Sequence, residues 1–126
     1  MPFTKEPTRT TPYVNINHES GVFEIQGTSS PEHAMAFYDP VYQAIAEFST
    51  HPSEKIEAHF RMIYFNTSSA RCIFKIIKEF KDLADQGKEV VINWHFEEDD
   101  DDMEDTGRDF MDLIDMPFNF VAEEED

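Results

Sequence analysis

The sequence predicts a single α/β domain in which strands alternate with helices around a mixed, mostly parallel sheet of about five strands. Two stretches, residues 55–65 and 89–96, alternate apolar and polar residues as half-buried strands do. Between them, residues 70–84 repeat apolar residues at the spacing of an amphipathic helix. A chain of 126 residues with twelve Phe is long enough to close around one core. Strands that alternate with helices pair in parallel through right-handed crossovers.

The first half of the chain predicts a flexible arm, a hairpin and a helix. Residues 1–10 are too polar to add to a core. Residues 13–18 and 22–26 alternate, and a tight turn at residues 19–21 joins them as an antiparallel hairpin at one edge of the sheet. Ser30 before Pro31 is typical of a helix start, and apolar spacing continues to Phe48. Pro40 predicts a kink or a restart in this helix, with Asp39 as a second cap.

The second half of the chain predicts three strands separated by two helices. The first of these helices starts at residues 66–69 and ends at Gly87. A strand at residues 89–96, a helix at 102–114 that Pro117 ends, and a strand at 118–121 complete the order β-β-α-β-α-β-α-β. The acidic residues 123–126 form a tail. The strand at 55–65 should bury Ile56, Ala58, Phe60, Met62 and Tyr64, and the helix after it should bury Ala70, Ile73, Phe74, Ile77, Phe80 and Ala84.

The charge balance excludes several classes of partner. A net charge of −17, from 27 acidic and 10 basic residues, would repel nucleic acid and anionic membrane surfaces. No apolar run reaches the roughly 20 residues that a membrane helix needs, so membrane insertion is not expected. Cys72 is the only cysteine and the start lacks an export pattern, which predicts a cytoplasmic protein. The acidic run at residues 97–105 is either a solvated segment or a docking surface for a basic partner.

A search for catalytic or ligand-binding patterns predicts a protein that is not an enzyme and holds no cofactor and no metal. Cys72 has no CxxC partner and no nearby histidine, so it is interpreted as a packing residue. His59 and His95 fall in the middle of two strands and would lie close together if those strands pair, but a metal site usually needs a third ligand. If Asp99 began a calcium loop, its sixth position would be Glu104 instead of the required glycine. Neither GxxxxGK[ST] nor GxGxxG occurs.

The helix start at residues 66–69 is the remaining candidate site. A helix N-terminus leaves backbone N–H groups unpaired and carries partial positive charge, so it suits an anion. A phosphoryl group on a hydroxyl there would add roughly −1.5 to −2 charge beside those donors. The alternative is plain capping, in which Thr67 or Ser68 accepts a hydrogen bond from one of the unpaired N–H groups. The two roles are compatible.

Four segments resemble the SiaC family of bacterial regulatory phosphoproteins. They are N-T-S-S at residues 66–69 directly after I-Y-F, G-x-x-x-I-Q-G-x-S-x-P-E at 21–32, V-I-N-W-H at 91–95 and M-P-F at 116–118. They recur in the family's order, and the resemblance covers residues 11–122. It implies a fold similar to STAS-domain anti-sigma-factor antagonists, with helices mainly on one face of the sheet. The acidic run at 97–105, the threonine-rich arm and Pro40 depart from the family pattern.

The resemblance also implies a partner switch. A cognate kinase with the histidine-kinase-like ATPase fold would phosphorylate Thr67, and a PP2C-type phosphatase would remove the phosphate. The unphosphorylated form would bind and activate a diguanylate cyclase, which links it to cyclic-di-GMP signalling and to biofilm formation or aggregation. The interaction surface would centre on Asn66, Thr67, Ser68 and Ser69, with Ser68 as the second candidate acceptor or cap.

Three other function classes stay open at this point. The first is an anti-sigma-factor antagonist that controls transcription through an anti-sigma-type kinase. The second is an enzyme with a deep pocket lined by His59 or His95 and carboxylates. The third is a structural protein, for which the absence of phosphorylation in cells would be the supporting observation.

Overall fold

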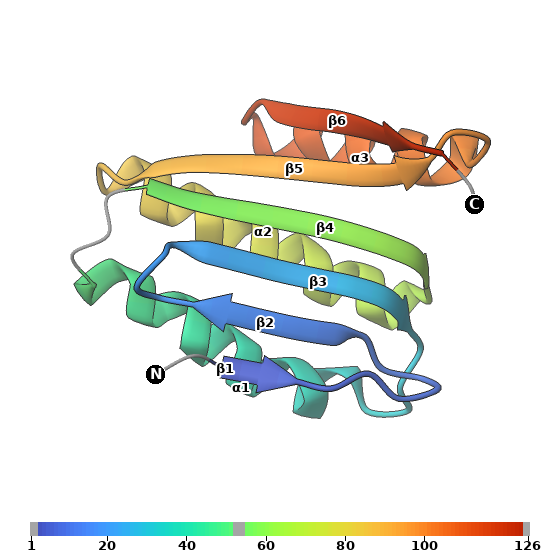
Figure 1. Cartoon of the computed structure of the whole chain (residues 1–126), viewed down its shortest axis with the longest axis horizontal. Coiled ribbons are helices and arrows are strands. Elements are labelled where there is room, and N and C mark those ends of the chain that lie inside the picture. Colours follow the sequence, from blue (N-terminus) through green and yellow to red (C-terminus); the bar gives the residue numbers. More distant parts are fainter. Residues whose placement is uncertain (1–2, 52–54, 125–126) are drawn as a thin grey trace.

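A six-stranded sheet in the order β1-β2-β3-β4-β5-β6 organises the computed structural model, which describes residues 3–51 and 55–124 (Figure 1). The first three strands are antiparallel, and β3, β4, β5 and β6 pair in parallel. The predicted α/β class and mostly parallel sheet are confirmed, with six strands instead of about five. The elements are β1 (Phe3–Lys5), β2 (Tyr13–Asn17), β3 (Val22–Ser29), α1 (Ala34–Ala46), the 3₁₀ turn η1 (Glu47–Thr50), β4 (Lys55–Phe65), α2 (Thr67–Asp85), β5 (Glu89–Glu97), α3 (Asp101–Ile114) and β6 (Phe118–Glu123).

The hairpin of β2 and β3 is confirmed, and its turn depends on a glycine. Gly21 has a φ of 74°, a left-handed conformation that favours glycine. A Cβ at this position would also collide with the backbone carbonyl of Lys55, where β4 begins. The turn can therefore lie against β4 only if residue 21 has no side chain.

The N-terminal arm differs from the prediction, because part of it joins the sheet. Residues Phe3–Lys5 form the edge strand β1, and Phe3 lies opposite Ile16 of β2. Phe3 is half-buried and packs against the core, which explains how a polar segment gains a fixed place. At the other end, Glu123 of the predicted acidic tail is the last residue of β6. Residues 125–126 of the tail and 1–2 of the arm lie outside the described residues.

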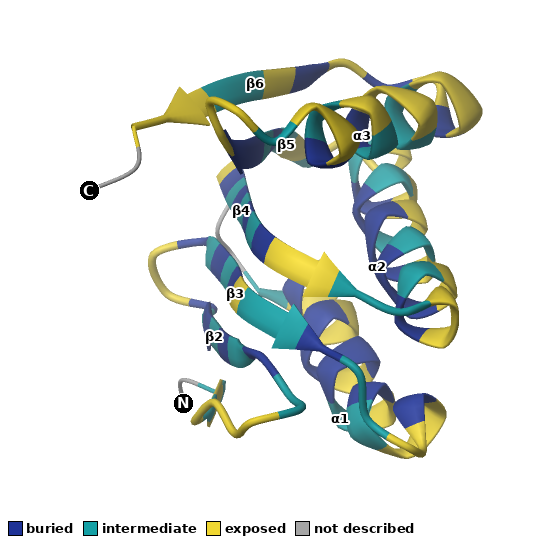
Figure 2. Cartoon of the chain, turned by 90° about the vertical axis from the view of Figure 1, so that its right-hand side faces the viewer, coloured by how far each residue is buried: buried dark blue, intermediate teal, exposed yellow. Residues whose placement is uncertain are grey.

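All three helices cover one face of the sheet, and the core lies between the two layers (Figure 2). Inward-facing residues of the strands alternate with half-buried ones on the open face, as β2 shows. The largest fully buried side chains are Trp94, Tyr38, Phe23, Phe48, Phe60 and Phe80. No helix among the described residues is long and apolar enough to cross a membrane. The open face of the sheet carries polar residues, to which the histidine pair described below belongs.

Helix α1 corrects two predictions. It begins at Ala34, not at Ser30 or Pro31, and its N-cap residue is His33. It also continues through Pro40 without a restart at Asp39. A proline inside a helix removes one backbone hydrogen bond. Here the loss is offset by an apolar face on both sides of Pro40 that packs into the core: Tyr38, Val41, Tyr42, Ala44 and Ile45.

Helices α2 and α3 lie where the sequence predicts them, but the buried face of α2 is rotated. Ala70, Phe74 and Ala84 are only half-buried. Tyr64, which was expected on the inner face of β4, is 54% exposed, because the register of β3 against β4 shifts between Gly27 and Thr28 and interrupts the alternation of β4 at Ile63. Gly87 ends α2 with a φ of 103°, as predicted. The buried residues of α2 are Ser69, Cys72, Ile73, Ile76, Ile77, Phe80 and Leu83.

Candidate functional site

The start of α2 is fixed by Asn66, which follows β4 directly. The Asn66 side chain accepts a hydrogen bond from the N–H of Ser69 at 2.9 Å, so Asn66 is the N-cap. Its own N–H donates to the carbonyl of Ser29, at the end of β3, over 3.0 Å. These two bonds tie the helix start to the sheet. The capping role that the sequence assigned to Thr67 or Ser68 therefore belongs to Asn66.

Ser69 is a buried anchor and does not contribute its side chain to the surface. It is 0% exposed, and its hydroxyl accepts from Ser29 Oγ at 2.8 Å. Ser29 Oγ lies 2.7 Å from the hydroxyl of Tyr38 on α1. Because Ser29 gives its proton to Ser69, Tyr38 donates to Ser29. Burial raises the pKa of Tyr38 to about 12, so this phenol keeps its proton at neutral pH. The sequence-predicted surface of residues 66–69 is thus reduced to its first three residues.

Thr67 and Ser68 are the two exposed hydroxyl residues of the first turn. In the part of the chain that the structure describes, no hydrogen bond engages either hydroxyl, since the cap and the buried contact are made by Asn66 and Ser69. Residues 67–70 are all neutral, so the partial positive charge of this helix end is not offset within its own first turn. The arrangement can accept a charged group on either hydroxyl without breaking a contact of the fold.

Exposed apolar side chains surround this helix start on three sides. The end of β4 that leads into α2 is exposed (Figure 2), with Ile63 at 63% and Tyr64 at 54%. Met35 lies in a groove between α1 and α2, and Leu113 lies in a smaller hollow between α2 and α3. Arg71, one turn after Thr67, lines both depressions. Exposed apolar groups gathered around one point are typical of a protein-docking surface.

Arg71, Met35 and Leu113 were missed by the sequence analysis. Met35 was counted only as part of the apolar spacing of its helix, and a single arginine or leucine on a helix gives no functional signal by itself. Only tertiary packing brings these three residues together, because α1 and α3 each pack beside the first two turns of α2. Ile63 alone gave a sequence signal, since it breaks the alternation near the end of its strand.

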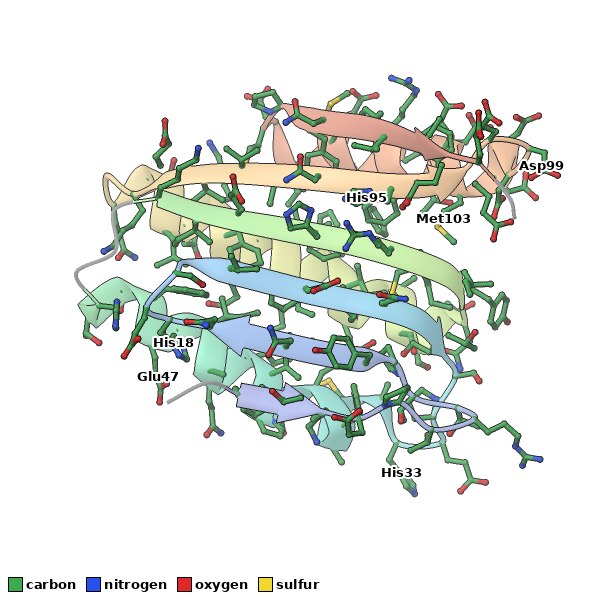
Figure 3. All side chains as sticks on the ribbon, viewed as in Figure 1. His18, His33, Glu47, His95, Asp99 and Met103 are labelled. Carbon is green, nitrogen blue, oxygen red and sulfur yellow. The ribbon has the colours of Figure 1, made fainter. Side chains whose placement is uncertain are left out.

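The predicted neighbours His59 and His95 do lie together, but far from Thr67 in the fold. His59 Nδ1 is 3.0 Å from His95 Nε2 on the open face of the sheet, and His95 is labelled in Figure 3. His95 Nδ1 is 3.1 Å from the carboxylate of Glu123, without the geometry of a hydrogen bond. Burial lowers the pKa of His95, and the nearby Arg61 guanidinium lowers it further, so the neutral form is favoured.

The charged residues around this histidine pair link neighbouring strands of the sheet. Arg61 binds Glu24 at 2.8 Å and lies 3.6 Å from Glu123, which links strands β3, β4 and β6 across the open face. Among residues 3–51 and 55–124, no group of three or more His, Cys, Asp or Glu side chains is arranged to hold a metal ion. Cys72 is buried, in agreement with its interpretation as a packing residue.

A family model, a curated relative and solved structures match nearly the whole chain. The family model described as "SiaC family regulatory phosphoprotein" matches residues 5–123. A Pseudomonas aeruginosa (strain UCBPP-PA14) protein, "Uncharacterized protein PA14_02130", is 24% identical over 118 residues, which are 94% of each chain. The crystal structure of apo-SiaC from Pseudomonas aeruginosa superposes with a TM-score of 0.87 at 23% identity, covering 97% of this chain and 99% of that one.

A second solved structure records an assembly. It is described as the crystal structure of diguanylate cyclase SiaD in complex with its activator SiaC from Pseudomonas aeruginosa. The chain matched there has a TM-score of 0.89 and 22% identity, with 96% of this chain and 99% of that chain covered. At these identities the structural likeness establishes a shared fold.

Proposed function

This chain belongs to the SiaC family of regulatory phosphoproteins, and we propose that it is the phosphorylated member of a partner switch, with Thr67 as its phosphoacceptor. A cognate kinase of the histidine-kinase-like ATPase fold adds the phosphate and a PP2C-type phosphatase removes it. The unphosphorylated form binds and activates a diguanylate cyclase, and so feeds cyclic-di-GMP signalling and aggregation or biofilm formation. The protein itself catalyses no step.

The position of Thr67 is the observation that carries this proposal. Its hydroxyl is exposed at the first residue of α2, while Asn66 caps the helix and Ser69 anchors it. A kinase can therefore reach Thr67 without unfolding the helix start. Ser68 is also exposed and is the second candidate acceptor. Ser69 is disfavoured, because phosphorylation would require its buried hydroxyl to leave Ser29.

The choice of a cyclase as target is supported by the related complex from Pseudomonas aeruginosa, in which a SiaC protein is described as the activator of the diguanylate cyclase SiaD. The same observation favours a cyclase over an anti-sigma-type kinase as the downstream protein. Membership of one family and coverage of residues 5–123 by its model support the transfer of this role to the present chain.

The physical basis of release is the cost of burying a charged phosphate. Exposed Ile63, Tyr64, Met35 and Leu113 surround Thr67, so a partner that covers them would also cover the phosphate. A dianionic phosphate loses its hydration when a partner covers it. This free-energy cost is not offset unless the partner supplies arginines that bind the phosphate. A loss of a few kcal/mol lowers affinity by a factor of hundreds.

The test is a cyclase activation assay with four forms of the protein: wild type, wild type with phosphothreonine at position 67, Thr67→Ala and Ser68→Ala. We expect activation by every form except the phosphorylated one. Ser68→Ala is the matched control, because it should still be phosphorylated by the kinase and inactivated, whereas Thr67→Ala should stay active in the presence of the kinase. Phosphopeptide mass spectrometry on protein from its native cells should map the phosphate to Thr67. Phosphate found only on other residues, or equal activation by the phosphorylated form, would overturn the proposal.

A further inference from the structure

The groove between α1 and α2 is the largest depression beside the candidate site, with a volume of about 670 Å³. Buried Ala34, Tyr42 and Cys72 contribute to its lining, and Met35, 60% exposed, stands at its rim. The start of α1 supplies one wall, and α2 supplies the other through Ser68, Arg71, Cys72 and Lys75. The groove thus combines an apolar lining with a wall that carries two positive charges.

The two cationic side chains of this wall, Arg71 and Lys75, form no ion pair with a carboxylate of the described residues. The Lys75 ammonium instead lies 4.3 Å above the ring of Tyr42. Lys5, Arg9 and Lys78 likewise have no ion pair among the described residues, so what sets Arg71 and Lys75 apart is that both line one groove. Four other basic residues, Lys55, Arg61, Lys81 and Arg108, do pair with carboxylates.

The acidic residues of the chain do not cancel this local charge. Glu32 alone of them lines the groove. The acidic run begins at the opposite edge of the sheet, as the positions of Asp99 and of His33, which lines the groove, show in Figure 3. At physiological ionic strength, exposed charges are screened beyond about 8 Å. The groove lining thus carries the two positive charges of Arg71 and Lys75 against the one negative charge of Glu32.

We propose that the α1–α2 groove docks an acidic segment of a partner protein, with carboxylates on Arg71 and Lys75 and an apolar side chain against Met35 and Tyr42. Charge complementarity selects an acidic segment, because two unpaired cations stand on one wall of an otherwise acidic protein. The apolar lining supplies affinity that carboxylates alone would not give. This inference goes beyond the proposed function, since it fixes the chemistry of the docked segment and does not depend on which residue accepts the phosphate.

The test uses the full chain and a display library of random twelve-residue peptides as the probe. We expect selection to enrich peptides that combine Asp or Glu with Leu, Ile, Phe or Trp. The affinity of the enriched peptides should fall at least tenfold with Arg71→Glu and with Lys75→Glu, and should weaken as salt is raised. Amide chemical-shift changes on binding should centre on α1 and the first half of α2.

Lys78→Glu is the matched control. Lys78 is exposed on the same helix but does not line the groove, so the substitution makes the same change of charge outside the groove. It should leave peptide affinity within about twofold. Met35→Asp should weaken binding by removing the apolar contact. The proposal is overturned by a selection that yields no binders, by enriched peptides without acidic residues, or by binding that survives Arg71→Glu and Lys75→Glu. Binding in the α2–α3 hollow would also overturn it. None of these results depends on cyclase activation, so the two proposals fail separately.

Discussion

Helices α2 and α3 start in the same way and differ in charge. Each is amphipathic, packs on the same face of the sheet, and is capped by a side chain: Asn66 accepts from Ser69 N–H at 2.9 Å, and Asp100 accepts from Met103 N–H at 3.0 Å. The first turn of α3 then carries Asp101, Asp102 and Glu104, whereas residues 67–70 at the start of α2 are neutral.

This difference indicates what each helix end can do. Acidic side chains in a first turn offset the partial positive charge of the helix. That end of α3 is already supplied with negative charge, and a further anion would meet repulsion. The end of α2 has the same unpaired N–H groups but no such charge, so an anion added there gains the full interaction. The acidic run, which the sequence left as either a solvated segment or a docking surface, has at least a local role in starting α3.

Gly107→Ala should have the largest effect on stability, and it acts on α3. A Cβ at residue 107 would lie 2.5 Å from two ring atoms of Trp94, which is fully buried and cannot move aside. We expect a loss of about 3 kcal/mol, the upper end for overpacking, although alanine is the better helix former. Urea unfolding measures it, with exposed Asp105→Ala as the control. An unchanged midpoint would mean that α3 is not held against Trp94 by close contact.

Ser69→Ala tests the anchor of α2 in the same assay. The change leaves the buried Ser29 hydroxyl without its acceptor, which should cost about 2 kcal/mol. Ser68→Ala, one residue away and exposed, should change stability by less than about 0.5 kcal/mol. Equal effects of the two substitutions would contradict the buried hydroxyl chain from Tyr38 through Ser29 to Ser69.

The sequence predicts these helix starts better than it predicts what surrounds them. Local signals suffice for the order of the elements from β2 to β6 and for the glycine that ends α2, because each depends on neighbours within a few residues. They place the start of α2 correctly but give its cap to Thr67 or Ser68 instead of Asn66, and they predict no cap for α3. The buried position of Ser69 depends on its hydrogen bond with Ser29, which lies 40 residues earlier in the sequence. Ser29 in turn bonds with Tyr38, which lies 9 residues after it. The pairing of β1 with β2 and the groove beside Met35 also result from tertiary packing, so no local sequence pattern predicts them.

Removing the caps should sharpen the comparison. Asn66→Ala should cost about 1.5 kcal/mol, because the first turn of α2 has no other group to satisfy the Ser69 N–H. Asp100→Ala should cost only about 0.5 kcal/mol, because loss of the cap is partly offset by relief of repulsion among the neighbouring acidic residues. Thermal unfolding of both variants at one pH and salt concentration gives the difference. A larger cost at Asp100 would show that charge crowding is unimportant in α3.

Adding or removing charge at the two helix starts is the most direct contrast, and the smallest in energy. Thr67→Asp should stabilise the protein by about 0.5 kcal/mol at low salt, because a carboxylate enters a neutral first turn. Asp101→Asn should have almost no effect, because the charge it removes is one of several that repel one another. Both changes should be compared at low salt and in about 0.5 M NaCl, where screening should abolish the gain from Thr67→Asp.

Thr67→Asn is the matched neutral control for this pair, since it keeps the shape of the aspartate without its charge. If Thr67→Asn stabilises as much as Thr67→Asp, the gain comes from local geometry and the two helix starts do not differ electrostatically. If Thr67→Asp is more stable than wild type and also loses cyclase activation, loss of function cannot be attributed to unfolding. A negative charge that strengthens the helix while it weakens docking is the behaviour a phosphorylation switch requires, because the modified form must stay folded for the phosphatase to restore it.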